Sequence, residues 1–182
     1  MAGARVLVVA ATGRELVPVE GAETIVCGIG PIDAAVSTAR ALAEERPTAV
    51  LNVGIAGARG LEPLTLVLGS EAIYCDADGP LVDARVAPDL DLLSRLRAAF
   101  PDARVLPIGT SARVGGTHDL DVEAMEGFGV LRACVFAGVP AVEVRVVSNE
   151  LGEPDRALWR FDEAFAALGE LLPRLVAVAS SA

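Results

Sequence analysis

The feature that most limits how this chain can fold is the alternation of short apolar runs with longer amphipathic segments. The short runs have the length and composition of buried strands, whereas the longer segments carry apolar residues at helical spacing. The expected strands are 5–10, 24–27, 49–55, 64–74, 105–108 and 140–147, and the expected helices are 31–46, 88–100, 122–137 and 155–178. Alternating strands and helices predict an α/β fold, in which a mainly parallel sheet is covered by helices on both faces.

Length and charge narrow the possible classes of protein. The 182 residues predict one domain, spanning 1–182, because two ordinary domains need a longer chain. A formal net charge of −10 argues against nucleic acid or an anionic membrane as a partner, since both need a basic surface. We also expect no membrane span, because no apolar run approaches the roughly 18 residues that one requires.

The cysteines and the N-terminal segment predict a cytoplasmic protein. Cys27, Cys75 and Cys134 are odd in number and lack CxxC spacing, which favours buried thiols in a reducing compartment over disulfides. The first residues lack a long apolar segment followed by a cleavage site, so we interpret them as the first strand rather than a signal peptide.

Several familiar catalytic motifs are missing or incomplete. The segment GIGPIDAA, which begins at Gly28, has Asp33 where a dinucleotide-binding fingerprint needs its third glycine. The sequence contains neither a GxxxxGK[ST] phosphate loop nor a GxSxG nucleophile motif. The single histidine, His118, is expected in a surface loop, and one histidine with dispersed cysteines predicts no metal site.

Polar residues at the ends of apolar segments are the remaining candidates for chemistry. Glu15 follows the first strand, Glu126 lies in the segment MEGFG, and the strand VEVRVVSNE contains Arg145 and ends in Ser148 and Asn149. Ligands of open parallel sheets bind just outside the carboxyl ends of the strands. Each residue also has an ordinary explanation, as a helix-dipole glutamate, a half-exposed helix residue or a turn residue. Pattern alone leaves these alternatives open.

Five segments, in order along nearly the whole chain, together match the pattern of one family. They are VVAATGRELVPV, CGIGPIDAAVSTARAL, LNVGIAGA, VLGSEAIYCDAD and AMEGFGVLRACVFAGVPAVEVRVVSN. The chain thereby resembles the nucleosidase branch of the purine nucleosidase and phosphorylase superfamily. The resemblance implies a single three-layer αβα domain around a central mixed, mainly parallel sheet. It also implies an enzyme that cleaves the N-ribosidic bond of a purine nucleoside with water, without a cofactor or metal, as a homo-oligomer.

The same resemblance implies roles for residues around the sugar. Glu15 matches the glutamate that takes a proton from the attacking water, a role for which a carboxylate is suited. Glu126 would accept hydrogen bonds from the ribose 2′- and 3′-hydroxyls and favour an oxocarbenium-like sugar. Met125 would pack against the ribose, and Gly57 would let the backbone come close to the ligand.

The end of the strand VEVRVVSNE is expected to face the purine base. Arg145 and Ser148 match positions close to the ligand, and Asn149 stands where other nucleosidases of the branch have Asp. An amide offers an NH2 donor and a carbonyl acceptor but no transferable proton. Because O6 of a 6-oxopurine is an acceptor, Asn149 is expected to favour hypoxanthine over adenine by roughly ten- to hundredfold.

The sequence departs from the family pattern in three places. The segment after Asp78 is shorter, residues 108–117 lack the aromatic side chain expected to stack on the base, and Arg14 precedes Glu15. Phosphorylases of the superfamily carry a phosphate-binding arginine in a nearby loop. A different purine nucleosidase, a nucleoside phosphorylase and a purine-binding protein without catalysis therefore stay open as alternatives.

Overall fold

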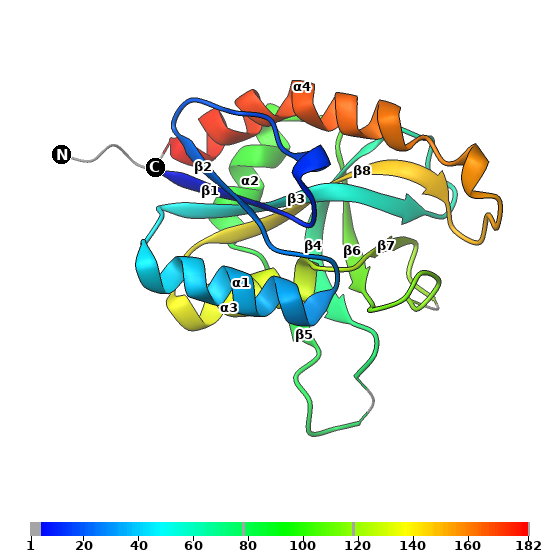
Figure 1. Cartoon of the computed structure of the whole chain (residues 1–182), viewed down its shortest axis with the longest axis horizontal. Helices are drawn as coiled ribbons and strands as arrows, with labels where there is room; N and C mark the ends of the chain where they lie inside the picture. The colour runs from blue at the N-terminus through cyan, green and yellow to red at the C-terminus, as the bar shows by residue number, and fades with distance from the viewer. Residues whose placement is uncertain (1–4, 78, 118, 182) are drawn as a thin grey trace.

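A mixed sheet forms the centre of the molecule (Figure 1). The computed structural model describes residues 5–77, 79–117 and 119–181. Within these ranges the sheet has the strand order β2-β1-β3-β7-β6-β4-β5, and β8 pairs with both β3 and β4. The strands are β1 Val6–Ala10, β2 Ala22–Val26, β3 Ala49–Ala58, β4 Leu66–Tyr74, β5 Arg85–Val86, β6 Arg104–Thr110, β7 Val122–Ala124 and β8 Ala141–Glu150.

Most of the strand pairs in this sheet are parallel. The parallel pairs are β1 with β2, β1 with β3, β3 with β8, β4 with β6, and β6 with β7. The antiparallel pairs are β3 with β7, β4 with β5, and β4 with β8. The prediction of a mixed, mainly parallel sheet is confirmed.

Helices cover both faces of the sheet, which confirms the three-layer architecture (Figure 1). Helices α2 (Leu90–Ala99) and α4 (Phe161–Ser180) pack on one face, and α1 (Pro31–Glu44) and α3 (Gly127–Ala137) pack on the other. In β1, Val6 and Val8 belong to the first core and Leu7 and Val9 to the second, as the two-residue period of a strand requires. No helix within the described ranges combines the length and apolarity of a membrane span.

The predicted helix 122–137 is wrong in its first five residues. Val122–Ala124 is a strand, β7, and α3 begins only at Gly127. Glu123 explains the difference, because its buried carboxylate accepts hydrogen bonds from the backbone N–H groups of Gly115 and Thr117. These contacts, with the pairing of β7 to β3 and β6, fix an extended backbone that local periodicity does not reveal. The two-residue strand β5 was not predicted either.

The amino ends of α1 and α3 meet near the carboxyl end of the sheet. A Cβ atom on Gly129 would lie 2.2 Å from the backbone oxygen of Pro31, so glycine is the residue that permits this close approach. As a result, the backbone N–H of Gly30 donates a hydrogen bond to Glu126 Oε1 at 3.1 Å. The packing of the two helices thus places a carboxylate at the edge where ligands of such sheets bind.

Candidate active site

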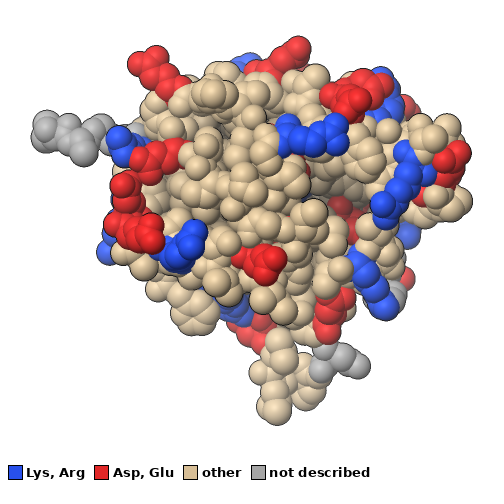
Figure 2. Space-filling view, viewed as in Figure 1, with Lys and Arg blue, Asp and Glu red and all other residues tan. Residues whose placement is uncertain are grey.

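A cavity of about 430 Å³ opens beside the carboxyl ends of β1, β3 and β8. Figure 2 shows the surface hollowed on the side towards which the β3 and β8 arrows of Figure 1 point. Of the seven residues that the sequence assigns to the site, this cavity brings together six, namely Glu15, Gly57, Met125, Glu126, Ser148 and Asn149. Arg145 does not line the cavity.

Glu15 lies at the end of η1 (Gly13–Glu15), the short helix that follows β1. Its Oε2 accepts hydrogen bonds from the backbone N–H of Thr12 at 2.9 Å and from the Thr12 hydroxyl at 3.1 Å. Its Oε1 accepts a weaker bond from the backbone N–H of Ile55 at 3.3 Å. Burial raises the pKa of Glu15, although Arg145 and the Thr12 N–H act in the opposite direction. A fixed carboxylate with a raised pKa suits general-base chemistry near neutral pH.

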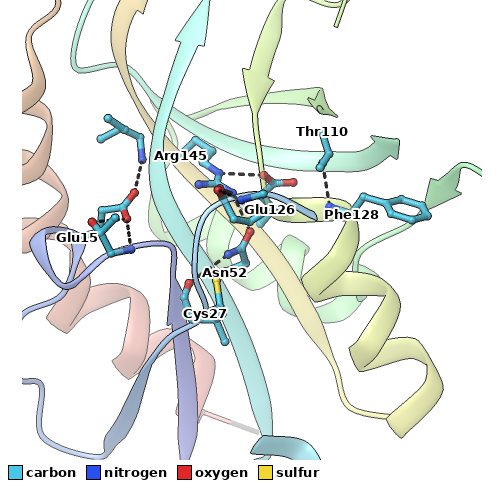
Figure 3. A network of polar contacts seen from close by, with 12 residues as sticks. Glu15, Cys27, Asn52, Thr110, Glu126, Phe128 and Arg145 are labelled. Carbon is cyan, nitrogen blue, oxygen red and sulfur yellow. Dashed lines mark hydrogen bonds and ion pairs between the residues drawn. The ribbon is translucent and has the colours of Figure 1, made fainter. Parts of the chain in front are cut away.

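Glu126 occupies the N-cap position of α3 and is held from two sides (Figure 3). Its Oε1 accepts the Gly30 N–H, and its Oε2 lies 3.4 Å from the Nη2 atom of Arg145. The side chain is 5 % exposed, and the residue lines the cavity. The prediction that Glu126 lies inside a helix is wrong by one position, because the residue stands at the N-cap, just before the first helical residue, Gly127. This position aims a fixed carboxylate at the cavity.

Arg145 is buried directly behind the carboxylates, with a side chain that is 1 % exposed. Its Nε donates to Glu143 Oε1 and its Nη2 to Asn52 Oδ1, both at 2.9 Å. Burial alone would lower the pKa of Arg145, but the neighbouring Glu143 and Glu126 carboxylates reverse this and raise it. Arg145 therefore stays charged and reaches a ligand only through Glu126. This geometry suits a positioning role better than the substrate contact that the sequence suggested.

Two further residues complete the environment of Arg145, and sequence reasoning missed both. Glu143 is fully buried, and its Oε2 has no hydrogen-bond partner among the described residues. Burial raises the pKa of Glu143, against the lowering effect of Arg145. Gly54 leaves the space that the site needs, since a Cβ there would lie 2.2 Å from Arg145 Nη1 and 2.7 Å from Glu15 Oε1.

Asn149 lies within β8, not after it, and its amide is held by neighbouring polar groups. The Ser148 hydroxyl lies 2.8 Å from Asn149 Oδ1 and 3.2 Å from the backbone oxygen of Ala56, so it can donate to either. Asn149 Nδ2 donates one N–H to the backbone oxygen of Glu150 at 3.1 Å. A Cβ on Gly57 would lie 3.0 Å from Nδ2. The second N–H of the amide is thus the group that can reach a ligand.

Aromatic side chains reach the cavity from a segment that the sequence analysis did not assign to the site. Trp159, Phe161 and Phe165 line the cavity, together with Arg156 from η2 (Arg156–Leu158). Residues 108–117, where the family pattern led us to expect the stacking aromatic, contain none. A usable signal was present, because Trp159, Phe161 and Phe165 stand close together in a chain with only 4 % aromatic residues.

Few further groups within the described residues bear on the chemistry of the cavity, and two residues of interest lie outside those ranges. His118 lies outside the described residues, and so does Asp78, where the shortened segment begins. No group of three His, Cys, Asp or Glu within the described ranges is placed to hold a metal ion. Cys27 lies near Glu126, but burial raises its pKa to about 12, so its thiol stays protonated at neutral pH.

A larger depression, of about 750 Å³, shares no lining residue with this cavity. It is lined by Arg5, Glu23 and neighbouring residues, and Arg5 pairs with Glu23.

Comparison with known proteins identifies the family. Residues 3–113, more than half of the 182, match the family model described as the phosphorylase superfamily. The chain belongs to the phosphorylase superfamily. The matched range includes Glu15, Gly54 and Gly57 and ends before Glu126 and Asn149.

Individual relatives extend the similarity over the rest of the chain. The futalosine hydrolase of Streptomyces coelicolor is 35 % identical over 191 residues, which cover 89 % of this chain and 81 % of that protein. A 5′-methylthioadenosine/S-adenosylhomocysteine nucleosidase of Marinomonas is 30 % identical over 156 residues, covering 69 % and 67 %. The structure of the Helicobacter pylori futalosine hydrolase superposes with a TM-score of 0.84 over 95 % of this chain and 97 % of that one. At 14 % identity, that likeness concerns the fold alone.

The unpartnered oxygen of Glu143 generates a prediction about stability. Glu143→Gln keeps an acceptor for Arg145 Nε and should change the free energy of unfolding by less than about 1.5 kcal/mol. Glu143→Leu removes that acceptor and leaves the buried Nε–H of Arg145 without a partner, which should cost about 1–3 kcal/mol or more. Urea unfolding at neutral pH measures both variants.

The pH dependence of the same two proteins tests the ionisation of Glu143. A carboxyl whose pKa is raised by folding contributes stability below its unfolded pKa, and this contribution is lost as pH rises through the folded value. Wild type should therefore lose stability relative to Glu143→Gln as pH rises above the ordinary glutamate range. An equal loss of unfolding free energy in Glu143→Gln and Glu143→Leu would contradict this account. So would stability that changes with pH in the same way in wild type and Glu143→Gln.

Proposed function

We propose that this chain is a futalosine hydrolase. It cleaves the N-ribosidic bond of futalosine with water and releases hypoxanthine and dehypoxanthine futalosine, a step of menaquinone biosynthesis. The observation that carries the proposal is the 35 % identity, over most of both chains, to the S. coelicolor futalosine hydrolase. The joint presence of Glu15, Glu126 and Asn149 in one cavity supports it.

The reaction separates charge, and the cavity has groups for both ends of the bond. As the bond to the base breaks, positive charge builds on the sugar and negative charge on the purine. Glu126 accepts hydrogen bonds from the ribose hydroxyls and stabilises the cationic sugar, in a buried setting where electrostatic effects are large. Glu15 takes a proton from the attacking water. Met125 packs against the ribose, and Gly57 lets the backbone come close to the ligand. Asn149 donates a hydrogen bond to the purine.

Asn149 and its neighbour support a 6-oxopurine as the leaving base. The Asn149 carbonyl is oriented by the Ser148 hydroxyl, and one amide N–H is bonded to the Glu150 backbone oxygen. The remaining N–H meets an acceptor such as O6 or N7 of hypoxanthine. A 6-amino group at the same place would bring two donors together and leave one unpaired.

The cations near the cavity support hydrolysis rather than phosphorolysis. Arg14 pairs with Asp162 at 2.6 Å and stacks on Phe165, and Arg145 is covered by Glu143 and Glu126. A phosphate nucleophile would need an uncompensated cation beside the sugar, next to Glu15, whereas Arg156, the arginine that lines the cavity, stacks on Trp159. Water as the second substrate requires only a general base, which Glu15 supplies.

The remaining features concern assembly and location. We propose a homo-oligomer, because Ile29, Ile32 and Val36 expose large apolar side chains at the start of α1, and Ile29 also lines the cavity. Burial of such a face against a second copy would be favourable. The three free cysteines support a reducing compartment such as the cytoplasm.

Product analysis tests the proposed reaction directly. Hypoxanthine release from futalosine should be rapid and unaffected by added phosphate, whereas inosine and methylthioadenosine should be poor substrates. Chromatography of the released base and sugar, with and without phosphate, makes the measurement. Good cleavage of methylthioadenosine without turnover of futalosine would favour the related adenine-specific nucleosidases, and a strict need for phosphate would favour a phosphorylase.

The role of Glu15 predicts both a variant effect and a pH profile. Glu15→Gln should lower kcat by about 10²–10⁴-fold while hypoxanthine still binds, because the amide cannot take a proton. In wild type the ionised base is lost as pH falls, and the raised pKa of Glu15 should place the midpoint above the ordinary glutamate value. Steady-state rates across pH measure both the loss of kcat and this midpoint. Glu20→Gln, a change at an exposed glutamate, serves as the control variant. Wild-type rates in Glu15→Gln would refute the assignment.

The role of Asn149 predicts a change in base selectivity. Asn149→Asp places a carboxylate oxygen opposite the Glu150 backbone oxygen and removes the amide donor. The ratio of kcat/KM for futalosine to that for its 6-amino analogue should fall about tenfold or more. Competition between the two nucleosides in one reaction gives this ratio directly. An unchanged ratio would remove Asn149 from the recognition of the base.

A further inference from the structure

Glu123 is a buried carboxylate in the cavity wall that the proposed reaction leaves unused. It lies in the middle of β7, the residue is 6 % exposed, and it lines the same cavity as Glu15, Glu126 and Asn149. Glutamate is rarely buried to this degree unless its carboxylate has partners, because desolvation of the charge is costly. The position of Glu123 therefore needs an explanation in terms of what its oxygens contact.

The sheet places Glu123 and Asn149 on either side of one glycine. Gly57 of β3 pairs with Glu123 of β7 on one edge and with Asn149 of β8 on the other. Paired residues on neighbouring strands project from the same face of a sheet. Neighbouring strands lie about 4.8 Å apart, so the Cα atoms of Glu123 and Asn149 are about 10 Å apart.

Gly57 keeps the space between these two side chains open. A Cβ atom at this position would lie 3.0 Å from Asn149 Nδ2, so a larger residue would crowd the amide. Gly57, Glu123 and Asn149 all line the cavity. The gap therefore suits a flat ring system that has the amide at one part of its edge and the carboxylate at another.

Three donors hold the Glu123 carboxylate and leave one of its acceptor positions for a ligand. Oε1 accepts the backbone N–H of Gly115 at 2.6 Å. Oε2 accepts the backbone N–H of Thr117 at 3.2 Å and the Thr117 hydroxyl at 2.9 Å. A carboxylate has about four acceptor positions, two on each oxygen. Oε1 can thus accept one further hydrogen bond.

Support of the loop 111–117 is the ordinary explanation for Glu123, but this loop has a second anchor. Asp76 accepts the Ser111 hydroxyl at 2.8 Å and the backbone N–H of Ala112 at 2.6 Å. Asp76 thereby fixes the start of the loop, and Glu123 fixes its end. Of these two carboxylates, Glu123 alone lines the cavity. Its place beside the ligand site is therefore a feature that support of the loop does not explain.

The acceptor of Glu123 and the donor of Asn149 together complement one kind of purine. A 6-oxopurine such as hypoxanthine has an acceptor at O6 and a donor at the adjacent N1–H, whereas adenine has a donor at the 6-amino group and an acceptor at N1. The Asn149 amide matches O6, and the Glu123 carboxylate matches N1–H. With adenine, the carboxylate would face the N1 lone pair, which leaves two acceptors without a proton between them.

We propose that Glu123 is a second residue that selects the base, by accepting a hydrogen bond from N1–H of a 6-oxopurine on the opposite side of Gly57 from Asn149. The inference rests on the proposed function in taking a 6-oxopurine as the leaving base. Selection is then shared between two strands, because Asn149 contacts O6 and Glu123 contacts N1–H. The second contact is the stronger of the two, since its acceptor is charged.

Free bases test this contact without turnover. Hypoxanthine should bind wild type about tenfold more tightly than 1-methylhypoxanthine, which keeps O6 but has a methyl group in place of the N1 hydrogen. Adenine should bind at least as weakly as 1-methylhypoxanthine, because it presents a lone pair at N1. Isothermal titration calorimetry measures the three dissociation constants. These titrations use the unaltered protein, so they test the contact whether or not a variant folds.

Two variants separate recognition of the base from support of the loop. Glu123→Gln replaces the charged acceptor by an amide and should lower the ratio of the adenine Kd to the hypoxanthine Kd about tenfold. Thr117→Val removes one donor to Glu123 Oε2 but keeps the carboxylate, so this ratio should stay at the wild-type value. A purely supporting role of Glu123 would weaken both bases alike and leave the ratio unchanged. Circular dichroism of both variants shows that the fold is kept.

Three results would overturn the proposal. They are equal binding of hypoxanthine and 1-methylhypoxanthine to wild type, an unchanged Kd ratio in Glu123→Gln, and an equal fall of this ratio in Thr117→Val. The outcome is independent of the futalosine assay. The expected base selectivity without futalosine hydrolysis would reject the proposed function and keep the role of Glu123. Hydrolysis of futalosine with an unchanged ratio in Glu123→Gln would reject the role of Glu123 alone.

Discussion

The buried guanidinium of Arg145 is the constraint on which the rest of the site depends. It contacts Glu143, Asn52 and Glu126 while almost wholly shielded from water. A carboxylate buried without a cation would be protonated or expelled to the surface, because desolvation of an isolated charge is so costly. Arg145 therefore makes it possible for Glu126 to stay beside the cavity in a rigid, largely dry position. Its own charge is secured in return by the carboxylates that surround it.

The fold explains why such a cluster forms at this place. In β8, Val142, Val144 and Val146 belong to the core under α2 and α4, so Glu143 and Arg145 must face the opposite layer. Their neighbours on that side are α3, whose N-cap position is Glu126, and β3, which contributes Asn52 and the space at Gly54. The cluster thus combines residues that are far apart in sequence, and central strands hold it rigidly.

The fold was largely predictable from the sequence, but the site was only partly so. Two-residue and helical periodicities are local, so they located most strands and helices to within a few residues. Family motifs marked Glu15, Glu126 and Asn149 because these residues stand in short segments that resemble the family's pattern. The importance of Glu143 depends on the burial of Arg145 beside the distant Asn52 and Glu126, and the strand at Val122–Ala124 depends on its pairing with β3 and β6. Trp159 was missed for the same reason, since only tertiary packing brings its segment to the cavity.

The absence of an acid at position 149 places greater weight on the charge balance around the sugar. In the proposed reaction, Asn149 would donate a hydrogen bond to the purine but could not protonate it, so stabilisation of the cationic sugar would become the larger share of catalysis. The buried cluster suits this task, because Glu15 and Glu126 present two carboxyl groups to the cavity while Arg145 lies behind them and donates to Glu143. Negative charge beside the sugar would complement an oxocarbenium-like transition state and add little in the neutral ground state, which is the condition for a gain in kcat. Arg145 thus sets how much negative charge the cavity can hold, and Glu143 fixes the position of Arg145.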